Sequence, residues 1–133
     1  MVIDTSAMVA ILRREPEERA FIDLIEAAEF RRMSVASFAE SSVVIESKFG
    51  PAGVLDLDRF VSSANVELIA VDLEQAYAAR VAFSRFGKGR HRAGLNFGDC
   101  FAYALAKVLG EPLLCKGRDF ALTDVTLAAE ASE

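Results

Sequence analysis

Short apolar segments alternate with longer helical segments over the whole length of this chain. The segments predicted to be strands are residues 1–3, 31–35, 66–71 and 113–115, with a further candidate at 125–127. Strands that alternate with helices are typical of βαβ units, in which helices cover both faces of a parallel sheet. The alternation therefore predicts an α/β fold. It also places any ligand site at the carboxyl ends of the strands, near the point where the strand order reverses.

The helices are predicted from their cap and break signals. They are expected over residues 7–14, 17–29, 37–48, 54–64, 73–86 and 96–109. Ser37 and Glu40 form an S-x-x-E capping-box pattern at the start of the third helix. The Gly-Pro-Ala-Gly segment at 50–53 is the clearest break in the chain, and Gly110 ends the last helix.

The length and composition fit a single globular domain, 1–133. A chain of 133 residues suits one domain, and 53% hydrophobic residues are too many for a disordered chain. The formal net charge of −5 argues against binding nucleic acid by overall charge alone. It leaves room for a local basic surface or for bound cations.

Neither a membrane segment nor an export signal is evident in the sequence. The longest unbroken apolar run, 100–106, is far shorter than the ~20 residues that a transmembrane helix requires. Asp4 interrupts the first apolar residues, and the positive pair at 13–14 follows them instead of preceding them. Cys100 and Cys115 are not in a C-x-x-C motif. We therefore expect a cytoplasmic protein with no membrane partner.

Acidic side chains recur where the predicted strands give way to helices. Asp4 follows the first strand, Glu40 lies just inside the helix after the second, and Asp99 lies in the first turn of the helix before the fourth. Asp119 and Asp124 follow the fourth strand. If the first and fourth strands are neighbours, these carboxylates converge on one edge of the sheet. Mg²⁺ and Mn²⁺ prefer such oxygen ligands, so the pattern predicts a divalent-metal site.

Each acid also has a purely structural explanation. Asp4 suits the cap of the first helix, and Glu40 suits the third position of a helix capped by Ser37. Asp99 suits the same position in a helix capped by Asn96. Acids at helix N-termini contribute about 0.3–1 kcal/mol each. Capping does not explain why acids recur on one side of the sheet, and this joint pattern favours the metal site.

The acids lie in ordered motifs along the chain: MVIDTSA at 1–7, SVASFAE at 34–40, GLNFGDC at 94–100, LLCKGRDF at 113–120 and TDV at 123–125. Together these motifs resemble PIN-domain ribonucleases, in particular the VapC-type toxins of bacterial toxin–antitoxin pairs. The resemblance covers about residues 1–127 and leaves a short C-terminal tail at 128–133. It implies a three-layer α/β/α fold with a central parallel sheet of four to five strands.

The resemblance implies Mg²⁺-dependent endoribonuclease activity, with Mn²⁺ as an alternative cofactor, and inhibition by a cognate VapB-type antitoxin. A homodimer is also expected. By position, the catalytic acids are Asp4, Glu40, Asp99 and Asp119, with Asp4 and Asp99 as the direct metal ligands. The chain departs from the family pattern at position 118, where relatives often have Asn or Asp and this chain has Arg118.

Three further residues are expected to support this site. The resemblance places Asp124 in the family's Thr-Asp pair, behind the acidic residues. Thr5 and Ser6 are candidates to hold a metal-bound water or a phosphate oxygen. The alternative is that both hydroxyls only bind backbone N–H groups in the first turn of their helix.

RNA hydrolysis by metal-activated water fits the residues present. The chain has one histidine, His91, so metal-free cleavage by a pair of histidines is nearly excluded. Three cations crowd the loop before the Asp99 helix, in a segment from 80 to 92 without an acid: Lys88, Arg90 and Arg92. We predict that they bind RNA phosphates, and the alternative is ordinary solvated surface charge.

Several aromatic residues lie in the two helices that carry Glu40 and Asp99. They are Phe38, Phe97, Phe101 and Tyr103. We predict that they fill the core between helix and sheet rather than stack RNA bases. The two cysteines are likewise expected to be buried, small hydrophobic residues.

Three other functions fit part of the sequence. A receiver-like phospho-switch domain needs an acidic pair after its first strand, whereas Asp4 is followed by Thr5 and Ser6. A haloacid-dehalogenase-type phosphatase needs a second acid at the position of Ser6. A non-catalytic PIN-type binding module also stays open, although intact Asp4, Glu40 and Asp99 argue against it.

Overall fold

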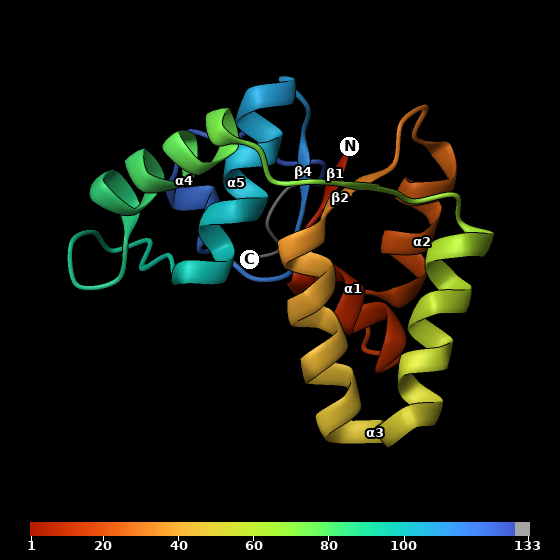
Figure 1. The fold of residues 1–133 in the computed structure, drawn as a ribbon. Coiled ribbons are helices and arrows are strands. Elements are labelled where there is room, and N and C mark those ends of the chain that lie inside the picture. The colour runs from red at the N-terminus through yellow and green to blue at the C-terminus, as the bar shows by residue number, and fades with distance from the viewer. Residues whose placement is uncertain (130–133) are drawn as a thin grey trace.

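Four short parallel strands form the central sheet of the computed structural model, which describes residues 1–129 (Figure 1). They are β1 (Val2–Ile3), β2 (Arg32–Ser34), β3 (Glu67–Ile69) and β4 (Leu113–Leu114), in the order β3-β2-β1-β4. Val2 pairs in parallel with Arg32 on one side and with Leu113 on the other. The predicted parallel sheet is confirmed, and the first and fourth strands are neighbours.

The candidate fifth strand at 125–127 forms only a single bridge, between Leu127 and Leu113. The N–H of Leu113 donates to the carbonyl of Thr126 (2.8 Å), and its carbonyl accepts from the N–H of Ala128 (2.8 Å). Within the described residues the sheet therefore has four strands. Of the predicted C-terminal tail, residues 130–133 lie outside the described part of the chain.

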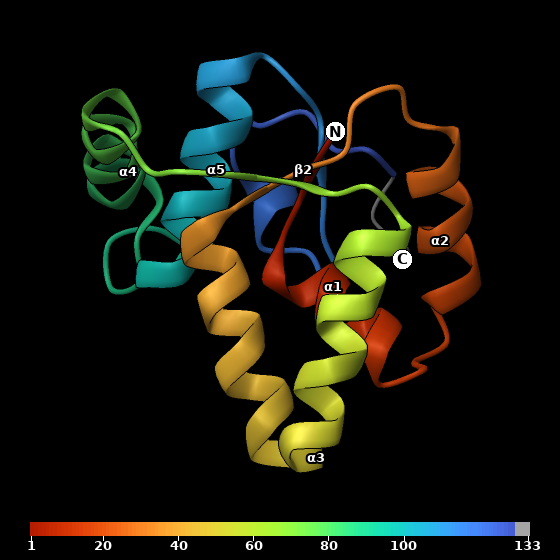
Figure 2. The same cartoon turned by 45° about the vertical axis from the view of Figure 1, so that its right-hand side comes forward.

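Helices cover both faces of the sheet. They are α1 (Thr5–Leu12), α2 (Glu18–Ala27), α3 (Val35–Ser63), α4 (Leu73–Phe86), α5 (Phe97–Leu109) and the short 3-10 helix η1 (Phe120–Leu122). Alternate strand residues face opposite sides: Val2 and Leu113 pack with α4 and α5, whereas Ile3 and Leu114 pack with α1 and α2. Figures 1 and 2 show these helix pairs on the two sides of the strands. The predicted three-layer α/β/α architecture is confirmed.

The longest helix, α3, consists of two arms joined by a sharp bend (Figure 1). Gly50 at the bend has φ 67° and ψ −159°, a conformation that residues with a side chain rarely adopt, and Pro51 begins the second arm. A Cβ atom on Gly53 would lie 2.6 Å from the Cβ of Phe49, so this position also requires glycine. The predicted break at 50–53 is confirmed. No helix among residues 1–129 is long and apolar enough to cross a membrane.

The predicted capping box at Ser37 and Glu40 is wrong. The helix begins earlier, and its N-cap is Ser34, whose Oγ accepts from the N–H of Ala36 (3.1 Å). Ser34 is also the last residue of β2 and pairs with Ile69 of β3, so the chain turns directly from strand into helix. Ser37 is buried inside the first turn. The carboxylate of Glu40 is consequently free to contact other helices.

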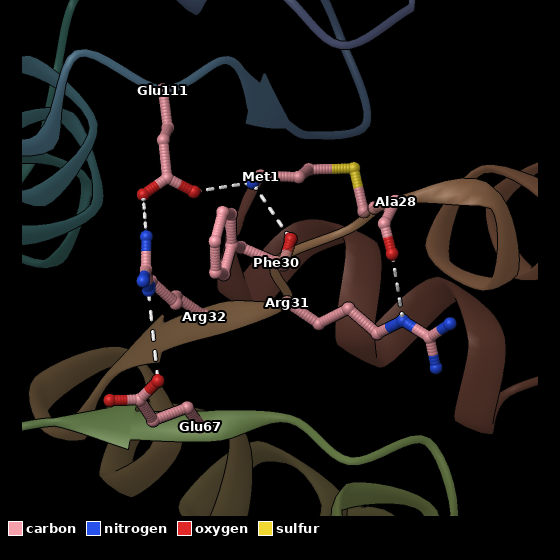
Figure 3. Close-up of polar contacts among 7 residues, drawn as sticks. All are labelled: Met1, Ala28, Phe30, Arg31, Arg32, Glu67 and Glu111. Carbon is pink, nitrogen blue, oxygen red and sulfur yellow. Dashed lines mark hydrogen bonds and ion pairs between the residues drawn. The ribbon is translucent and has the colours of Figure 1, made fainter.

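An ion-pair network joins the amino ends of the strands (Figure 3). Arg32 of β2 contacts Glu67 of β3 (Nε to Oε2, 3.7 Å) and Glu111, just before β4. Glu111 also accepts from the ammonium of Met1 (2.5 Å), which donates to the carbonyl of Phe30 (2.9 Å) as well. The network links residues in or just before all four strands at the end of the sheet opposite to the acidic residues, so it holds their register without entering the site.

Candidate active site at the carboxyl ends of the strands

Asp4 lies at the point where the strand order reverses. It follows β1, which lies between β2 and β4, and its N–H donates to the carbonyl of Leu114 (2.9 Å). Its Oδ2 accepts from the N–H (2.9 Å) and the hydroxyl (2.6 Å) of Ser6. Asp4 is therefore the N-cap of α1, as the structural explanation predicts. The cap uses only Oδ2 and leaves Oδ1 for another ligand.

The surroundings of Asp4 disfavour its negative charge. The residue is 3% exposed. The pKa of Asp4 is raised to about 6, because burial and, to a smaller extent, the charges of Asp99 and Glu40 outweigh the hydrogen bonds from Ser6 that lower it. A carboxylate in such a position is destabilised unless a cation is near it. This is more typical of a functional acid than of a simple helix cap.

Glu40 lies where the first turns of α1, α3 and α5 meet. The hydroxyl of Thr5 donates to Oε1 of Glu40 (2.7 Å) and to the carbonyl of Ser37 (3.2 Å). A Cβ atom on Gly98 would lie 2.5 Å from Oε2 and 2.7 Å from Oε1 of Glu40. Because Gly98 has no side chain, the carboxylate can lie against the positive end of α5. Gly98 is a site residue that the sequence analysis missed, although its place beside Asp99 was a signal.

Asp99 has the predicted capping role and also belongs with the other acids. Its N–H donates to Oδ1 of Asn96 (2.8 Å), and its Oδ2 accepts from the N–H of Asn96 (2.9 Å), so the capping box is confirmed. Burial raises the pKa of Asp99, the Asn96 N–H lowers it, and the charges of Glu40 and Asp119 raise it. The two explanations of Asp99 are therefore compatible, because the cap occupies only one of its oxygens.

Asp119 approaches these acids from the segment after β4. It is exposed at the start of η1 and makes no side-chain capping bond there. Burial raises the pKa of the Cys115 thiol to about 12, and the charges of Asp4, Asp119 and Asp99 raise it too. The charge of Asp119 contributes to the raised pKa of both Asp99 and the Cys115 thiol, so Asp119 belongs to the electrostatic surroundings of this site. We refer to Asp4, Glu40, Asp99 and Asp119 as the acidic cluster.

An open hollow of about 450 Å³ lies beside the acidic cluster. Acids, hydroxyls, an amide and an ammonium group line it: Asp4, Thr5, Ser6, Glu15, Glu40, Asn96, Asp99 and Lys116, with Val9 and Val44. The ammonium of Lys116 pairs with Glu15 (3.0 Å) and Glu17 (3.1 Å). The backbone N–H of Lys116 donates to Oγ of Ser6 (2.9 Å), which in turn holds Asp4. Sequence analysis did not assign Lys116 to this site, although it directly follows the fourth strand segment.

This lining fits a hard divalent cation. Mg²⁺ and Mn²⁺ bind carboxylate oxygens and water, and a cation would stabilise the ionised forms of Asp4 and Asp99, whose pKa values are raised mainly by burial and further by neighbouring acids. Among residues 1–129, no three His, Cys, Asp or Glu side chains are close enough to form a complete metal centre. A complete protein cage is not required, because Mg²⁺ usually binds through one or two carboxylates and keeps several waters.

The side chain of Asp124 contacts residues outside the acidic cluster, and its supporting role stays a prediction. It accepts a hydrogen bond from the hydroxyl of Tyr103 and forms ion pairs with Arg85 (3.3 Å) and Lys107 (3.5 Å). These partners belong to α4 and α5. Asp124 therefore anchors the C-terminal segment on the helices, because a buried tyrosine and two cations attract it there.

The predicted RNA-binding residues lie together on an exposed loop between α4 and α5: Lys88, Arg90 and Arg92. The loop ends are closed by bonds from the N–H of Lys88 to the carbonyl of Leu95 (2.8 Å) and from the N–H of Leu95 to the carbonyl of Phe86 (2.9 Å). His91 packs edge-on against Phe86, with 5.2 Å between ring centroids. The loop is thus a defined structure directly before the helix that carries Asp99.

Comparison with known proteins identifies the family of this chain. The family model described as PIN domain matches residues 1–125. The chain belongs to the PIN-domain family. This PIN domain is 58% identical over 125 residues to a protein named Ribonuclease VapC from Mycolicibacterium smegmatis, covering 94% of this chain and 97% of that relative. The resemblance to VapC-type proteins is thereby confirmed.

Two solved structures share the fold of this PIN domain. VapC20 of Mycobacterium tuberculosis, described as a toxin that cleaves the sarcin-ricin loop, has a TM-score of 0.76 at 15% identity, covering 94% of this chain and 95% of VapC20. VapBC2 from Rickettsia felis, bound to a DNA fragment from its promoter, has a TM-score of 0.76 at 15% identity, covering 99% of this chain and 98% of that chain. At this identity the two structures show the fold alone. The family match decides against the receiver and phosphatase alternatives.

Proposed function

We propose that this VapC-type PIN domain is an endoribonuclease that requires Mg²⁺, or Mn²⁺ in its place, and acts as the toxin of a toxin–antitoxin pair. The observation that carries the proposal is the acidic cluster, in which the carboxylates of the α1 cap, of α3 and of α5 line one hollow at the strand-order reversal, with Asp119 on the segment after β4. The name of the Mycolicibacterium smegmatis relative, a ribonuclease, supports the assignment of RNA as substrate.

The roles of the residues follow from their contacts. A bound divalent cation would lower the pKa of water and offset the negative charge that develops on the phosphate. Asp4 and Asp99 would hold it through the oxygens that their caps leave free. Ser6 fixes the carboxylate of Asp4, and Thr5 fixes that of Glu40, which can accept hydrogen bonds from bound water. Asp119, on the exposed segment after β4, adds a fourth negative charge that acts on Asp99.

The first prediction tests the metal-water mechanism directly. Purified protein without antitoxin should cleave RNA in Mg²⁺ and stop in excess EDTA. The products should carry 5′-phosphate and 3′-hydroxyl ends, because water attacks the phosphorus in place of the ribose 2′-hydroxyl. Sequencing of ligated fragments identifies these ends. Cleavage that continues in EDTA, or ends that carry a 2′,3′-cyclic phosphate, would contradict the proposal.

We further propose a VapB-type antitoxin and a second copy of this chain as partners. Structurally similar chains have been solved as toxin–antitoxin complexes, which supports an antitoxin partner. Several large apolar side chains on the two arms of α3 are exposed and offer surface for a partner: Val43 (66%), Phe49 (50%) and Leu55 (48%). Light scattering on the purified chain, with and without the product of an adjacent antitoxin gene, tests both associations.

The second prediction concerns the loop between α4 and α5. Replacing Lys88, Arg90 and Arg92 together with Ala should weaken RNA binding and reduce the slope of log Kobs against log salt by about 2, since each lost phosphate contact on single-stranded RNA contributes roughly 0.7. The measurement is a fluorescence binding titration at several salt concentrations.

A matched control removes the same charge elsewhere, from the exposed cations of α2 and the two arms of α3: Arg19, Lys48 and Arg59. The control triple variant should keep the wild-type slope. If both triple variants change the slope equally, the loop cations are ordinary surface charge.

A further inference from the structure

An aromatic hollow lies between α4 and α5, outside the acidic cluster. It has a volume of about 400 Å³, within the range of ligand pockets. Three phenylalanines and one cation shape it: Phe83, Phe97, Phe101 and Arg80. Phe97 is 78% exposed, so the prediction that it fills the core is wrong. Its ring is nevertheless oriented, because it packs edge to face against Phe101 with 4.9 Å between centroids.

Phe97 connects this aromatic hollow to the acidic cluster. Phe97 and Phe101 also line a neighbouring hollow of about 350 Å³, together with Glu40 and Asn96. Glu40 and Asn96 in turn line the hollow that holds Asp4 and Asp99. Phe97 is the first residue of α5, one position after the helix cap, so its ring lies at the border between the acidic and the aromatic surfaces.

We propose that the aromatic hollow receives one unpaired base of the RNA substrate, stacked on Phe97, next to the phosphodiester that is cleaved. This inference rests on the proposed function, because that function puts the RNA backbone at the acidic cluster. Aromatic rings stack every type of base, and they commonly lie in a basic groove that follows the backbone. Arg80 lines the hollow, and Arg90 of the adjacent loop stands over the ring of Phe83 (5.6 Å to the centroid).

The charge around the hollow favours RNA over a second copy of this chain. Apart from Arg85, which pairs with Asp124, the segment from 80 to 92 contains four cations and no acid: Arg80, Lys88, Arg90 and Arg92. A symmetric dimer formed through this surface would bring like charges together, since each subunit presents the same patch to the other. The phosphates of RNA complement the same patch.

The third prediction tests the stacking in a protein that does not cleave. All proteins carry Asp99→Asn, and the probes are short single-stranded RNAs of one sequence, in which either 2-aminopurine or an abasic site is moved along the strand. With Phe97 present, 2-aminopurine fluorescence should be quenched at one position, and an abasic site there should weaken binding roughly 5- to 150-fold. Phe97→Ala should abolish both effects, and Phe97→Tyr should restore them.

Two controls separate stacking from damage to the fold. Phe30→Ala removes another exposed phenylalanine ring, just before β2 at the end of the sheet opposite to the acidic cluster, and should leave quenching and affinity unchanged. Because Phe97 is exposed, Phe97→Ala should keep the wild-type melting temperature.

The outcomes also separate this inference from the proposed function. If the wild type cleaves RNA but no probe position is quenched, the stacking site is overturned and the nuclease proposal stands. The same holds if the wild type cleaves and the Phe97→Ala variant binds every probe as tightly as its parent. If Phe97→Ala dissociates a dimer and neither protein quenches a probe, the hollow is a subunit interface, and the stacking site is again overturned. Quenching that depends on Phe97 in a protein whose wild type does not cleave supports the base site while the nuclease proposal fails.

Discussion

RNA cleavage by Asp99→Asn is expected to fall by more than about a hundredfold, because even residues that only support a metal ligand cost roughly 10- to 100-fold when replaced. At the same time, the metal-free variant should melt at or above the temperature of the wild type. The substitution keeps the shape of the side chain and removes one negative charge from the acidic cluster.

The expected gain in stability follows from the raised pKa of Asp99. A carboxyl group whose pKa is higher in the folded state than in the unfolded chain destabilises the folded state once it is ionised. Burial and the charges of Glu40 and Asp119 together outweigh the hydrogen bond from Asn96. Asn can still accept that bond, so the hydrogen bond of the cap is retained, and the variant loses only the attraction between the charge and the helix dipole, about 0.3–1 kcal/mol. The advantage of the variant should vanish as the pH falls below 3.8, the ordinary pKa of Asp, because the wild-type side chain is then neutral in both states.

Melting curves in EDTA and in Mg²⁺, with a cleavage assay, measure both effects. Mg²⁺ should stabilise the wild type and leave Asp99→Asn almost unchanged. Asp124→Asn is the matched control, because the hydrogen bond from Tyr103 lowers the pKa of Asp124. The control should therefore lose stability at neutral pH and still cleave RNA. If Asp99→Asn is less stable in EDTA and cleaves normally, Asp99 is only a helix cap.

Gly98→Ala should reduce cleavage by about a hundredfold, although it adds only a methyl group. The new Cβ would lie 2.5 Å from Oε2 of Glu40, so the carboxylate must move away and lose its bond from Thr5. A misplacement of about 1 Å is enough to cost a hundredfold in rate. The protein should still fold, because the displaced group is the end of a flexible side chain. Ala is also favoured over Gly in a helix by up to ~1 kcal/mol.

A double-mutant cycle assigns this effect to Glu40. Cleavage rates are measured for Gly98→Ala, Glu40→Ala and the double variant, with melting temperatures for all three. Once Glu40 is truncated, adding Gly98→Ala should change the rate little further, because the clash is gone. Equal rate losses from Gly98→Ala in both backgrounds would mean that the glycine acts independently of Glu40.

The features that the sequence predicts well are those that depend on neighbouring residues. Gly50 and Pro51 break α3 because their backbone preferences are local, and Asn96 and Asp99 cap α5 because they lie three residues apart. The alternation of strands and helices likewise predicts the parallel sheet. The start of α3 is an exception: the local pattern predicts Ser37 as the N-cap, whereas the cap is Ser34. The helix can begin only where β2 ends, and the pairing of Ser34 with Ile69 of β3 decides that position.

The amino-acid sequence by itself therefore determined the fold class, the family and the positions of Asp4, Glu40 and Asp99 at the ends of elements. Only the tertiary structure decided which side chains meet there. The approach of Gly98 to Glu40 joins residues that are far apart in the chain, and so does the pairing of Asp124 with Arg85. Exposure of Phe97 is decided in the same way, since a helix residue is buried only if another element covers it. Contacts of this kind depend on how the helices pack, which short-range patterns do not encode.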